Sequence, residues 1–367
     1  MTLLSVPVAL GDRSYSISIA SGMIASGQAA DLIAALAPDS RACVVTHPGL
    51  RAAYAQPLEG GLRARGITAT VVTVPPGERT KNLRAVARLY ARFLAAGLDR
   101  RGLVVAVGGG VLGDLAGFAA ATYLRGVRFV QVPTTLLAQV DASIGGKTGV
   151  DLPEGKNLVG AFHQPAAVLI DPYTLRSLPA REMRAGLAEV IKYGIIYDRV
   201  FFDEIVSDLP ALRGRQEAAL TRIIARSCQI KAEIVAQDET EQGLRAILNF
   251  GHTIGHALEA VTAYRRYKHG EAVAIGMVSA ALIGEEIGLT PPSVTEAIAT
   301  ALRAAKLPVA FPADVSQEAI LEAAQRDKKV LAGRLRFVLA RRVGEVVVTG
   351  DVPSQAVCAA LARQKAA

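Results

Sequence analysis

The first half of the chain alternates β-branched runs with helical patterns. The β-branched runs are SYSISIA, ACVVTH, ATVVTV, LVVAVGGG, VRFVQVPTT and AAVLIDP. Between several of them lie Ala/Leu-rich segments such as LRAVARLYARFLAAGL, in which apolar residues recur at helical spacing. This alternation predicts an α/β fold in which helices cover both faces of a mostly parallel sheet.

Strand patterns almost disappear after about residue 178. Helices are predicted for PAREMRAGLAEVIKYGII, AALTRIIARSCQIKAEIVA, AILNFGHTIGHALEAV and AVAIGMVSAALIGEEIG, whereas RLRFVLARRVGEVVVTGDV predicts a late hairpin. A chain of 367 residues also exceeds what one core usually serves. We therefore expect an α/β domain over residues 1–178 and a mainly α-helical domain over residues 179–367.

The formal net charge of +8 does not indicate a nucleic-acid partner. The densest basic clusters are pairs rather than runs, aromatic residues make up 5% of the chain, and Trp is absent. A small phosphorylated or carboxylated substrate fits the charge as well. A basic nucleic-acid-binding protein is the weakest alternative, favoured by net charge alone.

Cysteine usage and hydropathy predict a cytoplasmic protein with no membrane partner. Cys43, Cys228 and Cys358 stand far apart and form no CxxC, which favours neither a disulfide framework nor a thiolate metal site. The apolar start MTLLSVPVAL lacks a basic region, and the longest apolar stretch, AVAIGMVSAALIG, is too short to span a bilayer.

A glycine-rich turn follows the predicted strand LVVAV. In LVVAVGGGVLGDLAG, the run Gly108–Gly110 precedes Gly113 and Asp114 at the start of a helix. Glycines let the backbone approach a ligand, and a helix N-terminus presents free N–H groups to a phosphate, so a dinucleotide pyrophosphate is the natural guest. The run departs from the GxGxxG phasing, and a simple tight turn is the alternative.

The segment VDASIGGKTGV resembles the end of a P-loop but lacks its first glycine, because Asp141 stands six residues before Lys147. What remains is a polar cluster among turn residues that comprises Asp141, Lys147, Lys156 and Asn157. Solvated loop residues are the alternative interpretation.

Two histidines four residues apart, His252 and His256, share one face of a predicted helix. Glu189 and Lys192 lie on another apolar helix, and His269 precedes a third. Charged groups on buried helices need partners, and a carboxylate with two imidazoles suits a divalent metal such as zinc that keeps room for substrate. Spacing alone does not decide which two imidazoles bind, and a purely structural pair remains the alternative.

Seven motifs in order between about residues 75 and 340 resemble the 3-dehydroquinate synthase family. They are GGGVLGDLAGFAAATYLRG, QVPTTLLAQVDASIGGKTGV, GKNLVGAFHQP, GLAEVIKYG, LNFGHTIGHALE, HGEAVAIGM and RDKKV. The resemblance implies a homodimer that pairs a Rossmann-like NAD-binding domain with a helical metal- and substrate-binding domain, with the active site in the cleft between them.

The activity that the resemblance implies is conversion of 3-deoxy-D-arabino-heptulosonate 7-phosphate to 3-dehydroquinate and phosphate, in the shikimate pathway. NAD⁺ is used catalytically in this family. It accepts a hydride from C5, phosphate leaves by β-elimination, the ketone is reduced again, and the opened enol closes in an aldol step.

The resemblance also assigns residues. The metal ligands are expected at Glu189, His252 and His269, with zinc or cobalt as the metal, and His256 is expected to face substrate and relay a proton through water. The expected NAD contacts are Glu78, Lys81, Gly110, Val111, Leu112, Gly113, Asp114, Thr134, Thr135, Lys147, Lys156, Thr174, Leu175, Arg176 and Ser177. The expected substrate and catalytic residues are Arg125, Asp141, Lys147, Asn157, Lys192, Lys231, Arg245, Asn249 and Lys328. In the family, the arginine equivalent to Arg125 reaches across the dimer.

Two positions depart from the family pattern. His47 stands where the family usually has an asparagine near the cofactor, which leaves that contact open. Lys268 stands where an apolar residue is more usual, and we expect its side chain to point to water.

Two related activities compete with this interpretation. One is a sugar-phosphate cyclase that makes valiolone-type or inosose-type rings from substrates without a carboxylate. Arg245 and Asn249 argue against it, because the pair resembles the carboxylate-recognition pattern of dehydroquinate synthase. The other is an iron- or zinc-dependent polyol dehydrogenase, in which phosphate-directed lysines would have no purpose.

Overall fold

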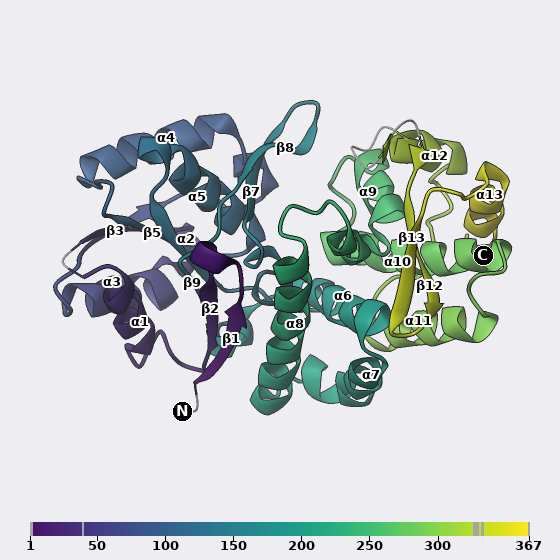
Figure 1. Ribbon diagram of the computed structural model, residues 1–367, viewed down its shortest axis with the longest axis horizontal. Coiled ribbons are helices and arrows are strands. Elements are labelled where there is room, and N and C mark those ends of the chain that lie inside the picture. The colour runs from purple at the N-terminus through teal and green to yellow at the C-terminus, as the bar shows by residue number, and fades with distance from the viewer. Residues whose placement is uncertain (1–2, 39, 326–329, 332–333, 366–367) are drawn as a thin grey trace. The chain divides into compact units, whose positions relative to one another are not determined.

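The computed structural model describes residues 3–38, 40–325, 330–331 and 334–365. The chain divides into two compact units (Figure 1). Unit 1 comprises Met1–Leu178 and Leu220–Thr240, and unit 2 comprises Pro179–Ala219 and Glu241–Ala367. Residues 220–240, which hold most of helix α8 (Glu217–Gln237), therefore belong with the α/β unit.

Unit 1 is built on a seven-stranded sheet with the order β1-β2-β9-β6-β5-β3-β4. The strands are β1 (Leu4–Val8), β2 (Tyr15–Ile19), β3 (Arg41–Thr46), β4 (Thr68–Thr73), β5 (Leu103–Gly108), β6 (Arg128–Pro133) and β9 (Ala167–Ile170). All neighbouring strands pair in parallel except β1 and β2. The predicted α/β fold with a mostly parallel sheet is confirmed.

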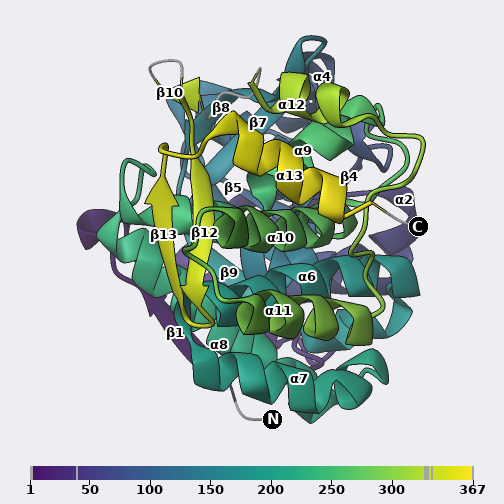
Figure 2. The ribbon, with the colours of Figure 1, turned by 90° about the vertical axis from the view of Figure 1, so that its right-hand side faces the viewer.

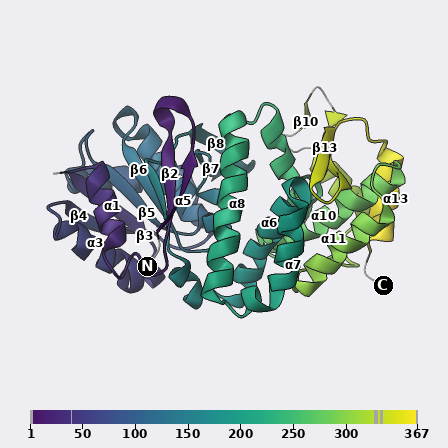
Figure 3. The same ribbon diagram turned by 60° about the horizontal axis from the view of Figure 1, so that its bottom comes forward.

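Helices cover both faces of this sheet. Consecutive residues of a strand point to opposite faces, and because both are apolar here, each face needs a cover. Val44 and Val105 pack with α1 (Gln28–Leu36) and α3 (Gln56–Arg63) in one apolar core. Val45 and Val104 pack with α4 (Leu83–Ala95) and α5 (Gly110–Thr122) in the other core. Figure 1 shows α4 and α5 on one side of the sheet, and Figure 3 shows α1 and α3 on the other. Near-continuous apolar strands are the sequence signature of this two-sided burial.

The strand order reverses direction between β3 and β5. From β3 the chain moves outward to β4, and it then returns to place β5 on the other side of β3, followed by β6 and β9. Ligands of open α/β sheets bind outside the carboxyl ends of the strands at such a switch point. Here β3 leads into His47 and β5 leads into the glycine turn.

A hairpin in unit 1 replaces the loop that the sequence predicted around Lys147 and Asn157. Strands β7 (Lys147–Leu152) and β8 (Gly155–Phe162) pair antiparallel, with Gly149 opposite Gly160. A Cβ on Gly149 would lie 2.7 Å from the carbonyl oxygen of Val159, so the two backbones meet where only glycine fits. Glycine-rich sequence signals turns locally, and only the pairing reveals the strands.

Unit 2 packs around helix α10 (His269–Glu286), whose residues Gly270–Gly284 are all buried. Figure 2 shows α10 among α6, α11, α13 and the β12–β13 hairpin. The remaining elements are α6 (Ala180–Tyr197), α7 (Arg199–Arg213), η7 (Leu244–Asn249), α9 (His252–Val261), α11 (Pro292–Ala304), α12 (Gln317–Gln325), β10 (Val330–Leu331), β11 (Arg334–Leu335), β12 (Phe337–Arg342), β13 (Glu345–Thr349) and α13 (Ser354–Arg363). The predicted late hairpin is confirmed by the antiparallel pairing of β12 and β13.

The helix predicted over residues 246–261 is interrupted. The turn η7 ends at Asn249, and α9 begins at His252 after Gly251, which has φ +79°. Gly251 takes this left-handed conformation easily because it has no Cβ. A helical pattern in the sequence does not show such a break, because the apolar spacing continues through it.

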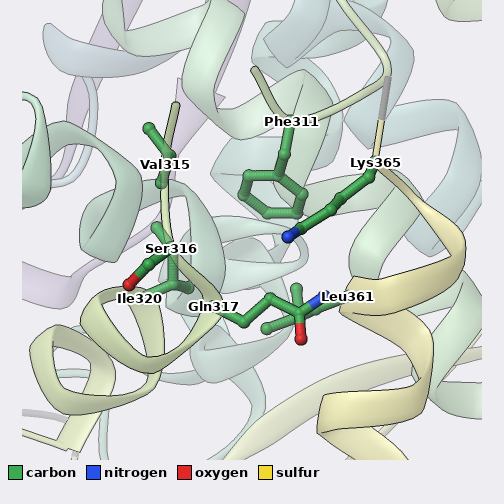
Figure 4. A pocket seen from close by; sticks show the side chains of 7 residues that line it. All are labelled: Phe311, Val315, Ser316, Gln317, Ile320, Leu361 and Lys365. Carbon is green, nitrogen blue, oxygen red and sulfur yellow. The ribbon is translucent and has the colours of Figure 1, made fainter. Parts of the chain in front are cut away.

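The C-terminal helix α13 is tied to α10 by a buried amide. Gln364 donates from Nε2 to the carbonyl oxygen of Ile275 at 2.8 Å and accepts from Ser279 Oγ at 2.6 Å. Beside this contact, side chains including Phe311, Ile320 and Leu361 line a hollow of about 10 Å³ (Figure 4). That volume suits one water at most and excludes a substrate.

Among the described residues, no helix combines the length and apolar character needed to cross a bilayer.

Candidate active site

Glycines allow the backbones of α6, α9 and α10 in unit 2 to pack in close contact. A Cβ on Gly255 of α9 would lie 3.1 Å from the carbonyl oxygen of Ala272 on α10, and a Cβ on Gly276 would overlap the carbonyl oxygen of Gly251. A Cβ on Gly270 would likewise overlap the backbone of Ala185 on α6. Because these backbones approach so closely, His252 and His269, the first residues of α9 and α10, reach the middle of α6.

Glu189 lies at the centre of this junction and is 0% exposed. Its Oε1 atom lies 3.7 Å from Nε2 of His252 and 3.5 Å from Nε2 of His269. The ligand atoms of the three residues all lie within 4.8 Å of one another. The structure therefore brings together the three side chains that the resemblance assigned to a metal.

An oxygen atom next to Nδ1 orients the ring of each of these two histidines, His252 and His269. Nδ1 of His252 lies 3.1 Å from the carbonyl oxygen of Phe250, and Nδ1 of His269 lies 3.2 Å from Oε2 of Glu259. An oxygen acceptor at Nδ1 favours a proton there and leaves the Nε2 lone pair free to act as a ligand. Both Nε2 atoms face Glu189.

This donor set fits a zinc-like ion. Carboxylate and imidazole donors bind zinc at about 2.0–2.2 Å, so two ligands of one tetrahedral ion lie roughly 3.3–3.5 Å apart. The Glu189–His269 and Glu189–His252 separations of 3.5 Å and 3.7 Å are close to this spacing. Three protein ligands leave further coordination positions for substrate oxygens.

Lys192, one turn after Glu189, forms an ion pair with Oε2 of Glu189. Both side chains are buried, so the ammonium group balances the carboxylate in a medium where an isolated charge is costly. Oε1, the other oxygen, is the one that faces the imidazoles.

The neighbouring carboxylates shift the pKa of His269. Burial lowers the pKa of its imidazole, but hydrogen bonds and charge from Glu189 and Glu259 outweigh burial and raise the pKa to about 10. This value belongs to the metal-free protein. A bound cation would take the place of the proton.

His256 lies beside the two other imidazoles. Its ring centroid is 5.3 Å from that of His252 and 5.9 Å from that of His269. A second group of possible ligands comprises His256, Glu259 and His269. Sequence reasoning missed Glu259, although His252, His256 and Glu259 at i, i+4 and i+7 lie on one helix face.

Arg245 and Asn249 lie on η7, directly before the turn that leads into His252. Arg245 is 1% exposed, and Asn249 donates from Nδ2 to Oε1 of Glu241 at 2.6 Å. The carbonyl oxygen of Phe250, which contacts His252, follows Asn249 by one residue. Arg245 and Asn249, which are expected to bind the substrate carboxylate, therefore lie close in the chain to the metal-ligand candidate His252.

In unit 1, most of the expected NAD residues follow the carboxyl ends of parallel strands, whereas Lys147 and Lys156 lie in the β7–β8 hairpin. A Cβ on Gly109 would lie 3.1 Å from Thr135, and one on Gly113 would lie 2.7 Å from Oε1 of Gln131, so the turn and the start of α5 need glycine for packing. Thr134 donates its backbone N–H to the carbonyl oxygen of Gly108 at 2.9 Å. The segment Thr174–Ser177 lies in the turn that follows β9.

Lys81 connects the glycine turn to the hairpin. Its Nζ atom lies 2.5 Å from Oδ2 of Asp114 at the start of α5 and also contacts Oδ1 of Asn157 on β8. Burial raises the pKa of Asp114, whereas the Lys81 ammonium lowers it. Burial alone would lower the pKa of Lys81, but the carboxylates of Asp114, Glu78 and Asp151 together outweigh burial, and the net pKa lies above its ordinary value.

Two further ion pairs lie in the same part of unit 1. Lys156 on β8 lies 3.6 Å from Oε2 of Glu78, and Lys231 on α8 donates to both Oδ1 and the carbonyl oxygen of Asp141 at 2.6 Å. Asp141 and Lys231 also act electrostatically on Asp114, so these groups share one neighbourhood. Lys147 begins β7 of the hairpin.

The other expected residues are placed as follows. Arg125 is exposed in the turn after α5 and has φ +68°. His47 directly follows β3, and partial burial lowers its pKa. Lys268 is exposed, as expected, and its Nζ lies 2.6 Å from Oε1 of Glu182, which is also partly exposed. Lys328 lies outside the described residues.

Family models match most of the chain. The model described as 3-dehydroquinate synthase N-terminal matches residues 71–185, and the one described as 3-dehydroquinate synthase C-terminal matches residues 186–330. The chain belongs to the 3-dehydroquinate synthase family. Relatives named 3-dehydroquinate synthase include one from Synechococcus sp. with 50% identity, covering 96% of both chains, and one from Caulobacter vibrioides with 46% identity, covering 99% of both.

Solved structures related to this family share the fold across the chain. A 2-epi-5-epi-valiolone synthase from Streptomyces hygroscopicus with NAD⁺ and Zn²⁺ bound has a TM-score of 0.88 and 30% identity, covering 97% of this chain and 98% of that one. A 2-deoxy-scyllo-inosose synthase complexed with carbaglucose-6-phosphate, NAD⁺ and Co²⁺ has a TM-score of 0.88 and 26% identity, covering 99% of this chain and 100% of that one. An iron-containing alcohol dehydrogenase, at 16% identity and a TM-score of 0.69, shares the fold alone.

Proposed function

We propose that this chain catalyses the 3-dehydroquinate synthase reaction, with NAD as a catalytic cofactor and one zinc or cobalt ion. The observation that carries the proposal is the convergence of Nε2 of His252 and Nε2 of His269 on Oε1 of Glu189. Curated relatives of this name match almost the whole chain, and two related cyclases bind NAD⁺ together with Zn²⁺ or Co²⁺. The reaction makes the enzyme a phosphate-eliminating carbon–oxygen lyase.

Glu189, His252 and His269 would hold the metal through one carboxylate oxygen and two Nε2 atoms. A bound metal would supply Lewis acidity to the substrate hydroxyls, and NAD⁺ would supply the hydride acceptor. Lys192 keeps Oε2 of Glu189 compensated, so that the ligand oxygen Oε1 stays directed toward the imidazoles. By holding the ion, Glu189, His252 and His269 would orient the substrate alcohol that is oxidised and later restored.

His256 takes the role of proton relay in this proposal. It is half-buried on the helix face that carries His252, and its ring lies within 5.9 Å of both other imidazole centroids. A neutral imidazole accepts a hydroxyl proton, directly or through water, and returns it when the ketone is reduced.

Charged groups in each unit suit the substrate's anionic ends. In unit 2, Arg245 and Asn249 would bind the carboxylate, because a guanidinium donates paired hydrogen bonds to its two oxygens. In unit 1, Lys147, Asn157 and Lys231 are the expected substrate contacts, and Asp141 holds Lys231 in place. Positive charge near the leaving phosphate stabilises the charge that develops during elimination.

The NAD assignment rests on the switch-point edge of unit 1. The glycine turn, Asp114, Glu78 and Lys81 lie in segments that follow parallel strands. Their partners Lys156 and Asn157 lie on β8 of the hairpin. We extend the proposal to NAD binding by the domain predicted over residues 1–178 and to metal and substrate binding by the domain predicted over residues 179–367, from which residues 220–240 are taken into unit 1 in the structure. A homodimer with Arg125 reaching the partner and a cytoplasmic location also belong to it, on the family resemblance.

The deciding experiment incubates the protein with NAD⁺, Zn²⁺ or Co²⁺ and 3-deoxy-D-arabino-heptulosonate 7-phosphate. We expect phosphate release and 3-dehydroquinate without net NADH, and no phosphate release after metal removal by a chelator. Turnover of sugar phosphates that lack a carboxylate, in preference to this substrate, would assign the chain to another cyclase. Net NADH formed from a simple polyol would assign it to the dehydrogenases that share the fold.

A further inference from the structure

Glu259 is a buried carboxylate that the proposed reaction leaves without a role. It is 4% exposed and lies on α9, in the last turn of the helix that begins with His252. Its Oε2 atom lies 3.2 Å from Nδ1 of His269 on α10. Burying a carboxylate costs free energy unless a partner compensates its charge. The contact with His269 supplies such a partner, and the question is what the buried carboxylate does for His269.

The two metal-ligand histidines are held in different ways. Behind His252, the acceptor at Nδ1 is the backbone carbonyl of Phe250, which no side-chain change removes. Behind His269, the acceptor is the Glu259 side chain. His269 begins its helix, so the helix itself does not fix the ring by packing on a preceding turn.

We propose that Glu259 is a positioning residue for the metal centre: by accepting a hydrogen bond from Nδ1 of His269, it keeps Nε2 directed at the ion that Glu189 and His252 share. The inference rests on the proposed metal site. A ligating histidine gains orientation and basicity from such a carboxylate, and its loss typically weakens metal binding 10–100-fold. Glu259 does not touch the ion in this arrangement.

The second ligand group offers the competing arrangement. His256, Glu259 and His269 place one donor atom each within 4.8 Å of one another, as a metal site would. In that case His269 would bind through Nδ1, and Glu259 would be a ligand itself. The two arrangements differ in the nitrogen of His269 that carries the proton, and only the filling of both groups at once would give two ions per chain.

The test compares Glu259→Gln with the wild-type protein and with Glu285→Gln. Glu285 is a matched control, since it is a largely buried carboxylate at the far end of α10 that pairs with Arg363 at 2.7 Å. Co²⁺ titration followed by absorption gives stoichiometry and coordination, and zinc transfer to a competing chelator gives affinity. We expect one ion per chain throughout, a zinc Kd about 10–100-fold higher in Glu259→Gln, and no change in Glu285→Gln. Glutamine keeps the length of the side chain but offers only a neutral, weaker acceptor, so an unchanged Kd in Glu259→Gln would show that the charged hydrogen bond does not help to hold the ion and would overturn the proposal.

A second variant separates reach from charge. Glu259→Asp keeps the negative charge but shortens the side chain, so we expect it to resemble Glu259→Gln. Wild-type zinc affinity in Glu259→Asp would show that charge alone matters and would overturn the hydrogen-bond role. In the wild-type zinc protein, ¹⁵N NMR of the imidazoles should place the His269 proton on Nδ1, and a proton on Nε2 would overturn the proposal even if the variants failed to fold.

Failure of this inference is distinct from failure of the proposed function. If Glu189→Gln loses zinc while Glu259→Gln binds it normally, the metal site stands and Glu259 has no part in it. If Glu189→Gln keeps stoichiometric zinc, the proposed metal site itself is wrong.

Discussion

Oε1 of Glu189 and Nε2 of His269 lie 3.5 Å apart, although the two residues come from different helices, α6 and α10. Replacing Glu189 by Gln removes the negative charge and leaves a weaker, neutral ligand. We expect Glu189→Gln to abolish turnover mainly through metal loss, measured as zinc per chain after dialysis. Glu204→Gln, an exposed change on α7, serves as the control and should retain both zinc and activity. Stoichiometric zinc and full activity in Glu189→Gln would refute the assignment.

Close packing of α10 against α9 at Gly276 holds the helices that carry His252 and His269 in position. A methyl group at this position would overlap the carbonyl oxygen of Gly251 and lie 2.8 Å from the backbone nitrogen of Gly255. We expect Gly276→Ala to lower the free energy of unfolding by about 1–3 kcal/mol or more and to weaken zinc binding, because α9 must move away from α10. Denaturant unfolding and chelator competition measure the two effects.

Gly60→Ala is the control for this change. Gly60 lies in helix α3, and a methyl group added there would meet no atom within 4 Å, so alanine should stabilise the protein by about 0.5–1 kcal/mol. If Gly276→Ala were equally harmless, close backbone packing would not be what brings His252 and His269 together.

Arg245 is expected to bind the substrate carboxylate. We expect Arg245→Ala to raise KM or lower kcat on the order of 10²-fold, about the 2–5 kcal/mol attributed to a lost buried charge pair. Steady-state kinetics with the heptulosonate phosphate measure the change, and Arg303→Ala, an exposed change on α11, controls for the loss of an arginine. Unchanged kinetics in Arg245→Ala would mean that the carboxylate is held elsewhere.

The pKa of about 10 at His269 predicts how metal binding depends on pH. The folded pKa lies above the unfolded value of about 6.5, so the charged imidazole stabilises the metal-free fold fully below about pH 6.5. That stabilisation is lost as pH rises toward 10. Zinc must displace this proton, so its affinity should rise by up to about tenfold per pH unit between about pH 7 and 9, with protons released.

Zinc titrations in buffers of different ionisation enthalpy measure the number of protons released. We expect close to one proton from His269 at pH 8, because its pKa lies well above that pH and the site binds zinc only in the neutral form. A zinc affinity that stays flat from pH 7 to 9 would contradict the raised pKa.

Much of the fold follows from local pattern. The near-continuous apolar runs at Val44–Val45 and Val104–Val105 predicted strands buried on both faces, and the two cores confirm it. The hairpin β7–β8 was missed because Gly149 and Gly160 weaken the strand signal and act only through their pairing. The break at Gly251 was missed because a left-handed residue interrupts the backbone without interrupting the apolar spacing.

The sequence by itself determined the α/β and helical halves, the glycine turn and the set of residues able to bind a metal, because these depend on residue type and short spacing. Tertiary structure alone decided that Glu189, His252 and His269 meet, that Lys192 and Glu259 stand directly behind them, and that Lys81 joins Asp114 to Asn157. The physical reason is that the apolar spacing within one helix shows which face is buried but does not specify which other helix packs against that face. Close backbone contact at glycines such as Gly255 and Gly276 sets which side chains become neighbours.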